Sequence, residues 1–241
     1  MFFHLITKYN IKKAYLNDLN DKLIDTYINI RDNSDKLIKA LKKLESSYYS
    51  STDRKGFYLK KRTEFNKLSL SLKKSSLFIF LNKIGYNGMY RENLKGEYNI
   101  PFGEMNEPKI CDKELIENVS KLLNENDIEF SSKSFEDTLI NKKNVFYYLD
   151  PPYRPISKTS DFTSYTSNKF DDELQVKLKD YCDEVDSKGS FFMQSNSYST
   201  DSFFQNLYSK YNIDNVSVTR TISADGNKRD KIKEIVIFNY D

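Results

Sequence analysis

The residues best suited to chemistry form one short turn, Asp150-Pro151-Pro152-Tyr153. The turn follows an apolar run at residues 145–149 that is typical of a buried strand. Two successive prolines cannot continue a strand ladder and each fixes its own φ, so the turn is stiff and holds the Asp150 and Tyr153 side chains in defined directions. Because α/β sheets bind ligands at the carboxyl ends of parallel strands, we expect a site here.

This turn offers two hydrogen-bond acceptors and an aromatic face. The exocyclic amine of a nucleobase is a poor nucleophile, because its lone pair is delocalised into the ring. The Asp150 carboxylate and the Pro151 carbonyl could each accept one N–H of such an amine, and both bonds would strengthen as positive charge develops on nitrogen. Tyr153 would stack on a base that had left its duplex. Four residues alone are also compatible with a plain stiff turn, in which Asp150 is a cap and Tyr153 a core residue.

Strand-like runs and helical patterns alternate on both sides of the turn. The strand-like runs lie at residues 13–16, 128–130, 145–149, 190–193, 216–222 and 232–240. Helical spacing of apolar residues occurs at residues 23–30, 112–124, 171–185 and 200–211. The alternation predicts a mainly parallel α/β sheet, and the turn Asp225-Gly226-Asn227 predicts that the last two strands form an antiparallel hairpin.

A different pattern occupies the stretch between the first and second strand-like runs. Apolar residues keep helical spacing from residue 34 to about residue 81, which predicts a helical lobe. Residues 82–104 contain four of the seven glycines of the chain together with aromatic residues and Pro101. This composition predicts a loop or hairpin with tight turns, and a surface loop of this kind is the best candidate for a recognition element.

Composition excludes several classes of protein. With 38 basic and 35 acidic residues, the net charge of +3 is too small to indicate a nucleic-acid partner by itself. Cys111 and Cys182 lie far apart and His4 is the only histidine, so we expect no metal site, no disulfide framework and no histidine-based triad. No stretch approaches the roughly 18 uncharged apolar residues of a membrane span, so we expect a cytoplasmic protein without a membrane partner.

Ordered segments on both sides of the turn match one known family. The segment around the turn comprises residues 145–155, Ser157, Thr159, residues 161–163, Tyr165 and Phe170. Further matching segments lie at residues 80–91, 96–103, 195–197, 207–208, 220–223 and 234–240. Together they resemble the Dam-type adenine-N6 DNA methyltransferases, class alpha or D12 class, over nearly the whole chain. The resemblance implies a Rossmann-like S-adenosylmethionine-dependent methyltransferase sheet with a helical DNA-recognition lobe and hairpin.

The resemblance also implies roles for individual residues. Asp150 would contact both the target amine and the methionine part of the cofactor S-adenosylmethionine, and the rest of the Asp150–Tyr153 turn would complete the catalytic site. Asp18 matches the acidic residue that binds the cofactor ribose, and Ser134-Phe135 matches the position that packs on its adenine. Without the neighbouring motifs, the simpler interpretations would be a helix N-cap for Asp18 and an ordinary core residue for Phe135.

Double-stranded DNA is the partner that the resemblance implies. The hairpin positions that match are Tyr86, Asn87, Met89, Arg91 and Pro101. Arg and Asn side chains read guanine and adenine edges through paired hydrogen bonds, and an apolar group can touch the thymine methyl. Family members that read GATC commonly have Arg-Tyr after the Pro-Phe-Gly, where this chain has Glu104-Met105, so the target sequence is open. We expect a monomer, with a cognate restriction enzyme as a further candidate partner.

The N-terminal region departs from the family pattern. Members normally open with a strand that ends in a Phe-x-Gly-Gly-type turn, whereas this chain has no glycine before Gly56 and residues 1–5 resemble the helix that follows the turn. We therefore expect the first strand, with roughly thirty to forty residues, to be absent. An internal methionine taken as the start, a split gene whose other fragment completes the site, and a working variant are the three explanations.

These observations lead to one prediction with two alternatives. We predict a catalytic methyltransferase domain from residues 1–33 and 108–241, and a target-recognition lobe from residues 34–107 with its hairpin at 82–104. The predicted activity is methyl transfer from S-adenosylmethionine to adenine N6 in duplex DNA, with base flipping. The alternatives are a catalytically inactive DNA-binding remnant, and a methylase of RNA or of a protein amide.

Overall fold

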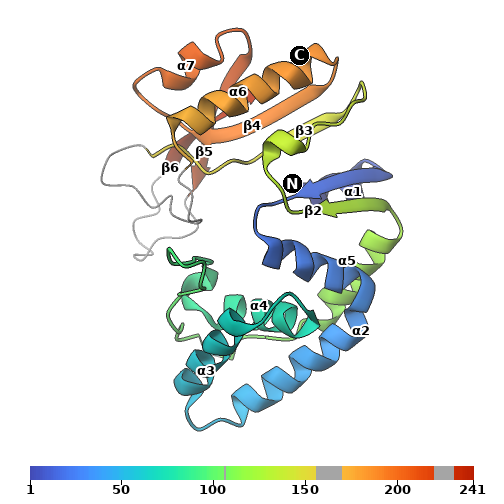
Figure 1. The fold of residues 1–241 in the computed structure, drawn as a ribbon, viewed down its shortest axis with the longest axis vertical. Helices are drawn as coiled ribbons and strands as arrows, with labels where there is room; N and C mark the ends of the chain where they lie inside the picture. Colours follow the sequence, from blue (N-terminus) through green and yellow to red (C-terminus); the bar gives the residue numbers. More distant parts are fainter. Residues whose placement is uncertain (106, 156–169, 220–230) are drawn as a thin grey trace. The chain divides into compact units, whose positions relative to one another are not determined.

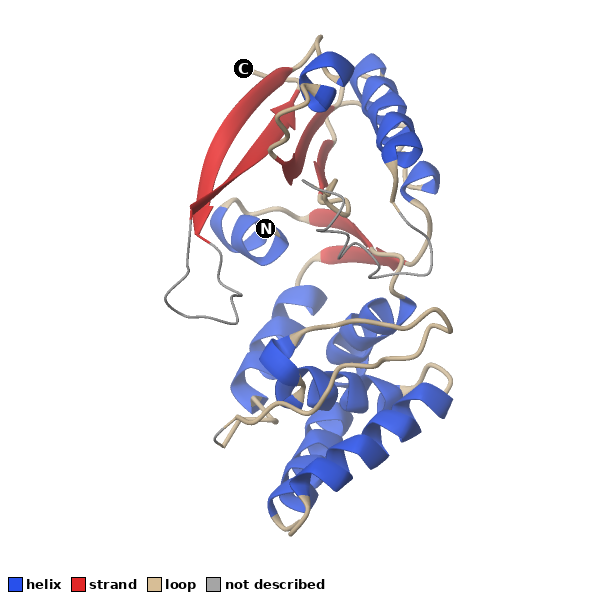
Figure 2. Cartoon of the chain, turned by 90° about the vertical axis from the view of Figure 1, so that its left-hand side faces the viewer, coloured by secondary structure: helices blue, strands red, loops and turns tan. Residues whose placement is uncertain are grey.

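Two compact units make up the chain, Met1–Ser134 and Phe135–Asp241. The computed structural model describes residues 1–105, 107–155, 170–219 and 231–241. Helices and strands occur in both units, so the protein is mixed α/β (Figures 1 and 2). The predicted assignment of residues to a catalytic domain and a recognition lobe stays a prediction.

Helices dominate the first unit. Its elements are α1 (Phe2–Lys8), β1 (Lys13–Asn17), α2 (Asp21–Tyr49), α3 (Arg54–Lys67), α4 (Leu72–Ile84), the 3-10 turn η1 (Tyr86–Gly88), α5 (Lys113–Asn124) and β2 (Asp127–Ser131). β1 and β2 pair in parallel, with Asn17 opposite Ser131. A small core that includes Ile6, Leu123 and Ile128 packs α1 and α5 on these strands, and an aromatic-rich core joins α2, α3, α4 and the segment after η1.

The long helix α2 was expected as two separate helical patterns. Its N-cap is Asn20, whose side chain accepts hydrogen bonds from the Lys22 and Leu23 N–H groups of the first turn. The helix then runs through the predicted boundary at residues 33 and 34, where Asn33 departs from helical geometry with φ −135° and ψ 28°. The helix is therefore kinked at Asn33, but the chain does not leave it there.

Residues 85–103 form an irregular hairpin, as the glycine pattern predicted. Two isolated antiparallel bridges join Gly85 to Phe102 and Glu92 to Tyr98. Its tip is a tight turn at Gly96, with φ +73°, a backbone conformation that glycine adopts at little cost. A Cβ at Gly103 would lie 2.8 Å from the Ile84 carbonyl oxygen, so glycine is needed where the two arms approach each other.

The second unit is built on a four-stranded sheet. Its elements are the 3-10 turn η2 (Phe135–Asp137), β3 (Phe146–Leu149), α6 (Asp172–Ser187), β4 (Phe191–Ser197), α7 (Phe203–Leu207), β5 (Asn212–Thr219) and β6 (Lys231–Phe238). The strand order is β3-β4-β6-β5. Helix α6 lies along the sheet (Figure 1), and its side chains Leu178, Cys182 and Val185 share a buried core with Phe192 of β4 and Ile235 of β6.

Pairing in this sheet is mixed. β3 and β4 are parallel, whereas β6 is antiparallel to both β4 and β5. The predicted antiparallel pairing of the last two strands is thus confirmed, although its predicted turn at residues 225–227 lies outside the described residues. Among the helices that the structure describes, none is both long enough and apolar enough to cross a membrane.

Candidate active site

Asp150 lies at the carboxyl end of β3, as predicted. Leu149 is paired with Gln194 in the parallel β3–β4 register, so the next residue of each strand, Asp150 and Ser195, are neighbours at the same edge. The Ser195 Oγ donates a hydrogen bond of 2.8 Å to Asp150 Oδ1. The carboxylate is exposed, and no described residue donates to its second oxygen, Oδ2. One oxygen therefore orients the carboxylate and the other remains available as an acceptor.

The two prolines present their carbonyl groups differently. The Pro152 carbonyl accepts a 3.3 Å hydrogen bond from Gln175 Nε2 of α6. Gln175 is fully buried and its own oxygen accepts from Asn196 Nδ2, so this peptide is fixed to both α6 and β4. No donor to the Pro151 carbonyl occurs among the described residues. The turn thus has two acceptors on successive residues, Asp150 Oδ2 and the Pro151 oxygen, to which the described part of the chain supplies no donor.

Tyr153 is half-buried, and its hydroxyl donates to Glu234 Oε2 of β6 at 3.2 Å. Burial raises the pKa of Tyr153 to about 12, so the hydroxyl stays protonated and remains a donor at neutral pH. The contact links the end of the turn to a strand that lies beyond β4 in the sheet. It limits rotation of the ring that was predicted to stack on a base.

Arg154, immediately after the turn, is anchored through its backbone. Its N–H donates to Asn196 Oδ1 at 3.0 Å and its carbonyl accepts from Ser197 Oγ at 2.6 Å. No role is predicted from the sequence for the side chains that hold the turn, which are Ser195, Asn196, Ser197, Gln175 and Glu234. The sequence does contain an indication for three of them, since Ser195-Asn196-Ser197 follows the next strand-like run along the chain. Neighbouring parallel strands end at the same edge of a sheet, so these residues are expected near Asp150.

Asp18, the predicted ribose ligand, follows β1 in the first unit. Its Oδ1 accepts a 2.7 Å hydrogen bond from the Asn20 N–H, and Asn20 in turn caps α2. The alternative in which Asp18 itself caps a helix is therefore wrong. The carboxylate is exposed, and no described residue donates to Oδ2, which suits an acceptor of ribose hydroxyl groups.

The segment that leads to Ser134 is held beside the loop that carries Asp18. Asn17 Oδ1 accepts from Ser131 Oγ at 2.8 Å and from the Lys133 N–H at 3.1 Å, and Asn17 Nδ2 donates to the Lys133 carbonyl. The Ser132 hydroxyl also donates to the Leu19 carbonyl at 3.3 Å. These hydrogen bonds therefore hold the loops after β1 and β2 together at the carboxyl edge of this parallel pair.

Phe135, the predicted adenine neighbour, begins the second unit. Its ring meets the Tyr181 ring of α6 edge-on, with centroids 5.7 Å apart, and lies 6.2 Å from Phe170. The ring packs against the core of its unit and remains half-buried. The prediction that Phe135 is a core residue is thus partly right. Only the exposed portion of its ring is accessible to a ligand.

Four of the five predicted DNA-reading residues are exposed on the hairpin. Tyr86 and Pro101 are joined by a 3.0 Å hydrogen bond from the Tyr86 N–H to the Pro101 carbonyl, which places them on adjacent arms. Exposed Asn87 has a φ of +53°, and exposed Arg91 donates from Nε to Asn99 Oδ1 at 2.8 Å. Met89 is half-buried and packs on the aromatic core, so it supports the hairpin more than it presents a reading surface.

Comparison with known proteins gives the family of the chain. The family model for D12 class N6 adenine-specific DNA methyltransferases matches residues 1–222. The type II methyltransferase M.MjaIII of Methanocaldococcus jannaschii is 41% identical over 246 residues, which cover 100% of this chain and 84% of that protein. The type II methyltransferase M1.LlaDCHI of Lactococcus lactis subsp. cremoris is 38% identical, with 100% of this chain and 82% of that protein covered.

A third relative gives the same result. The DNA adenine methylase of Escherichia coli strain K12 is 31% identical over 228 residues, which cover 94% of this chain and 79% of that protein. The matches point to adenine in DNA rather than to RNA or a protein amide. The chain belongs to the D12 class of N6 adenine-specific DNA methyltransferases.

Proposed function

We propose that the Asp150–Tyr153 turn is the catalytic centre and that it acts on an adenine extruded from duplex DNA. The observation that carries this proposal is the pair of available acceptors on successive residues, Asp150 Oδ2 and the Pro151 carbonyl oxygen. We also propose a Rossmann-like methyltransferase sheet for the catalytic part, which the parallel β1–β2 and β3–β4 pairs and the inserted antiparallel β6 support.

In this proposal each acceptor holds one hydrogen of the adenine N6 amine. Asp150 Oδ2 holds one and the Pro151 oxygen holds the other, which favours the tetrahedral nitrogen geometry that methylation requires. Ser195 keeps the carboxylate oriented through Oδ1, so little reorganisation is needed as charge develops. Tyr153 stacks on the extruded base while its hydroxyl is held by Glu234.

The methyl donor in this proposal is S-adenosylmethionine, which supplies an electrophilic methyl group when bound. The residues present fit such a group. Asp18 has an exposed carboxylate with one oxygen free of described donors, as an acceptor of ribose hydroxyls needs. Phe135 offers a half-buried ring for the adenine, and Ser134 precedes it in the matching position.

DNA recognition is assigned to Tyr86, Asn87, Met89, Arg91 and Pro101 of the hairpin. Asn87 and Arg91 have the donors and acceptors that read base edges, and both are exposed. Glu104 is exposed near the end of the same hairpin, where a carboxylate repels nearby phosphates. Sequencing of a methylated plasmid will identify the target, and Arg91→Ala is expected to relax the choice of one base in it.

Replacement of Asp150 by Ala tests the catalytic assignment. We expect methyl-tritiated S-adenosylmethionine to label DNA with the unaltered protein and not with the Asp150→Ala protein. Asp180→Ala is a matched control, because it removes the same charge from a 69% exposed side chain of α6. Undiminished labelling with Asp150→Ala refutes the catalytic role of the turn.

Calorimetric titration with S-adenosylhomocysteine tests the cofactor assignment independently of turnover. We expect binding heat for the unaltered chain and a clear loss of affinity for Asp18→Ala. A catalytically inactive remnant that has lost the cofactor would give no heat with either protein.

A further inference from the structure

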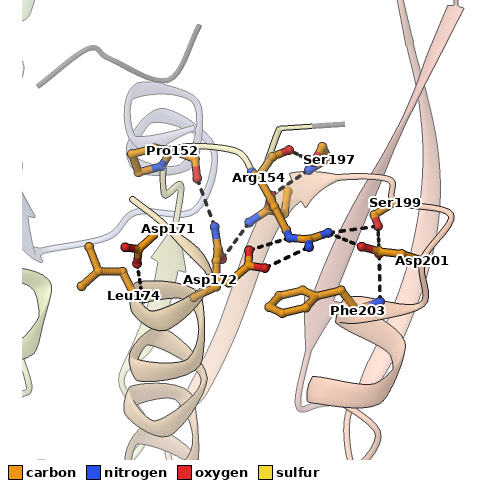
Figure 3. Close-up of polar contacts among 11 residues, drawn as sticks. Pro152, Arg154, Asp171, Asp172, Leu174, Ser197, Ser199, Asp201 and Phe203 are labelled. Atoms are coloured by element: carbon orange, nitrogen blue, oxygen red, sulfur yellow. Dashed lines mark hydrogen bonds and ion pairs between the residues drawn. The ribbon is translucent and has the colours of Figure 1, made fainter. Parts of the chain in front are cut away.

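The Arg154 side chain occupies a built site of its own next to the turn. Its guanidinium makes a two-point contact with Asp172, from Nε to Oδ1 at 2.7 Å and from Nη2 to Oδ2 at 3.0 Å. Nη1 donates to Asp201 Oδ2 at 2.6 Å. Figure 3 shows the guanidinium between these two carboxylates, with Phe203 beside it and its ring centroid 4.2 Å from Arg154 Cζ.

These partners come from three different parts of the second unit. Asp172 is the first residue of α6, where an acidic side chain is favoured by the helix dipole. Asp201 precedes α7, and Phe203 is the first residue of that helix. The Arg154 backbone is bonded to Asn196 and Ser197 of β4. One residue therefore joins β4, α6 and the α7 region directly after Tyr153.

Burial and charge make the contact a strong one. The Arg154 side chain is only 18% exposed, and Arg–carboxylate pairs with two parallel hydrogen bonds are both stronger and more directional than single contacts. Its hydrogen bonds with Asp172 raise the pKa of Arg154 above its ordinary value. With two carboxylates engaged, the guanidinium has little positive charge left for a DNA phosphate.

The geometry points to Arg154 as a positioning residue that fixes the catalytic turn through Asp172 and Asp201. The inference rests on the proposed catalytic role of the Asp150–Tyr153 turn. The turn contains two prolines and is attached to its surroundings at Asp150, Pro152 and Tyr153, and at Arg154 directly after it. The guanidinium contacts with Asp172 and Asp201 reinforce the backbone anchor at Arg154, so their loss weakens this anchor and loosens the directions of the Pro151 carbonyl and the Tyr153 ring.

Hydrogen exchange gives the first test, because it does not require turnover. In Arg154→Gln we expect the backbone amide of residue 154 to exchange about tenfold faster or more, since its bond to Asn196 is weakened. Arg31→Gln is the matched control. Arg31 also makes a two-point contact, with Asp32, and lies 5.3 Å from the Phe130 ring, but it is in α2. Unchanged exchange in Arg154→Gln, or an equal change at residue 154 in Arg31→Gln, overturns the inference.

Kinetics give the second test. We expect kcat to fall about 10- to 100-fold in Arg154→Gln, with KM for S-adenosylmethionine changed by less than about threefold, because geometry rather than binding is lost. Arg154→Lys should restore only part of kcat, since an ammonium cannot make the two-point contact. A weaker and less salt-dependent affinity for DNA in Arg154→Gln would identify a phosphate contact instead and overturn the inference.

Asp150→Ala separates this inference from the proposed function. If Asp150→Ala retains labelling, the catalytic role of the turn fails, and the exchange measurement still decides whether Arg154 orders it. If Asp150→Ala is inactive while Arg154→Gln keeps full kcat and full protection, only the positioning role fails.

Discussion

The proposed role of Asp150 depends on its second oxygen, because the described residues donate only to Oδ1. Ser195 donates to Oδ1 and Gln175 donates to the Pro152 carbonyl, whereas no residue in the described part of the chain donates to Asp150 Oδ2 or to the Pro151 carbonyl. Ser195 and Gln175 are both buried, so neither side chain takes up space on the exposed side of the turn. Within the described ranges, the groups that bond to Asp150 and Pro152 are neutral side chains of β4 and α6.

Acid should weaken the Arg154 site in a defined pH range. Hydrogen bonds from Ser199, Arg154 and the Phe203 N–H lower the pKa of Asp201 to about 2. Because this value lies below the unfolded value of about 3.9, the stabilisation is present above about pH 4 and is lost as the pH falls through about 2. Asp201→Asn should be less stable than the unaltered protein at pH 7, and the difference should shrink between pH 4 and pH 2. Urea unfolding curves across this range measure it; a constant difference contradicts the prediction.

The Tyr153 hydroxyl and ring should contribute separately. Tyr153→Phe keeps the stacking face and removes only the bond to Glu234, so we expect a loss of methylation rate of less than about tenfold. Tyr153→Ala removes the face, which is worth about 1–3 kcal/mol per base. Single-turnover methylation and the fluorescence of 2-aminopurine at the target position distinguish the two variants. Equal defects in both would show that the hydroxyl, not the ring, matters.

The turn proposed as the catalytic centre was predictable from sequence, whereas its supports were not. Two prolines after an apolar run restrict the backbone locally, and no distant residue is needed to recognise them. Ser195 and Gln175 reach the turn only through the β3–β4 register and the packing of α6 on β4, which a single sequence does not specify. Arg154 lies in the segment that resembles the family, but its pairing with Asp172 and Asp201 depends on tertiary structure.

Secondary structure elements followed the predictions where hydrophobic periodicity was strong. The predicted 200–211 helix shortens to α7 at Phe203–Leu207, because Ser202 has a φ of +57° and interrupts the helix at its start. β5 begins earlier than the predicted run, at Asn212, since its first residues are largely polar and give no apolar signal. These polar residues are part of the strand because their backbone groups pair with β6 along its full length.

A salt bridge links the hairpin to the start of α2. Lys22 Nζ lies 3.1 Å from Glu92 Oε1, with side chains 20% and 13% exposed, and the Tyr90 hydroxyl donates to the same carboxylate. Glu92 follows the predicted base reader Arg91, and Lys22 lies in the first turn after the Asp18 loop. The hairpin is therefore attached to the element that carries the proposed ribose ligand, within one unit.

Glu92→Gln should loosen this attachment. We expect it to lower the free energy of unfolding by about 1–3 kcal/mol, because Lys22 and Tyr90 lose a charged partner in a half-buried place. Glu117→Gln breaks the exposed pair with Lys113, whose side chains are 57% and 46% exposed, and should cost less than about 1 kcal/mol. Denaturation curves compare them; similar losses would mean that the Glu92 contact is an ordinary surface pair.

Each of the two units has its own buried core. Phe80 of α4 and Phe192 of β4 are both fully buried, in the cores of the first and second unit respectively. A chain organised in this way is expected to depart from simple two-state unfolding. The cofactor residues proposed from sequence fall in both units, Asp18 and Ser134 in the first and Phe135 and Asp150 in the second.

Core substitutions should separate the two transitions. Phe80→Ala and Phe192→Ala should each lower one calorimetric transition, by about 3–5 kcal/mol of unfolding free energy, and leave the other nearly unchanged. Differential scanning calorimetry of both variants measures this. A single transition that shifts equally in both variants contradicts the division.

The place of β6 in its sheet matters for how the protein is made. β6 follows β4 and β5 in the chain but lies between them. During synthesis, the backbone N–H and C=O groups of β4 and β5 that face β6 stay unpaired until residues 231–238 have left the ribosome. A polypeptide that stopped just upstream of Lys231 would lack β6, and the edges of β4 and β5 that pair with it would be open to pairing with other chains. We therefore expect the chain to depend on chaperones until β6 has been synthesised and paired.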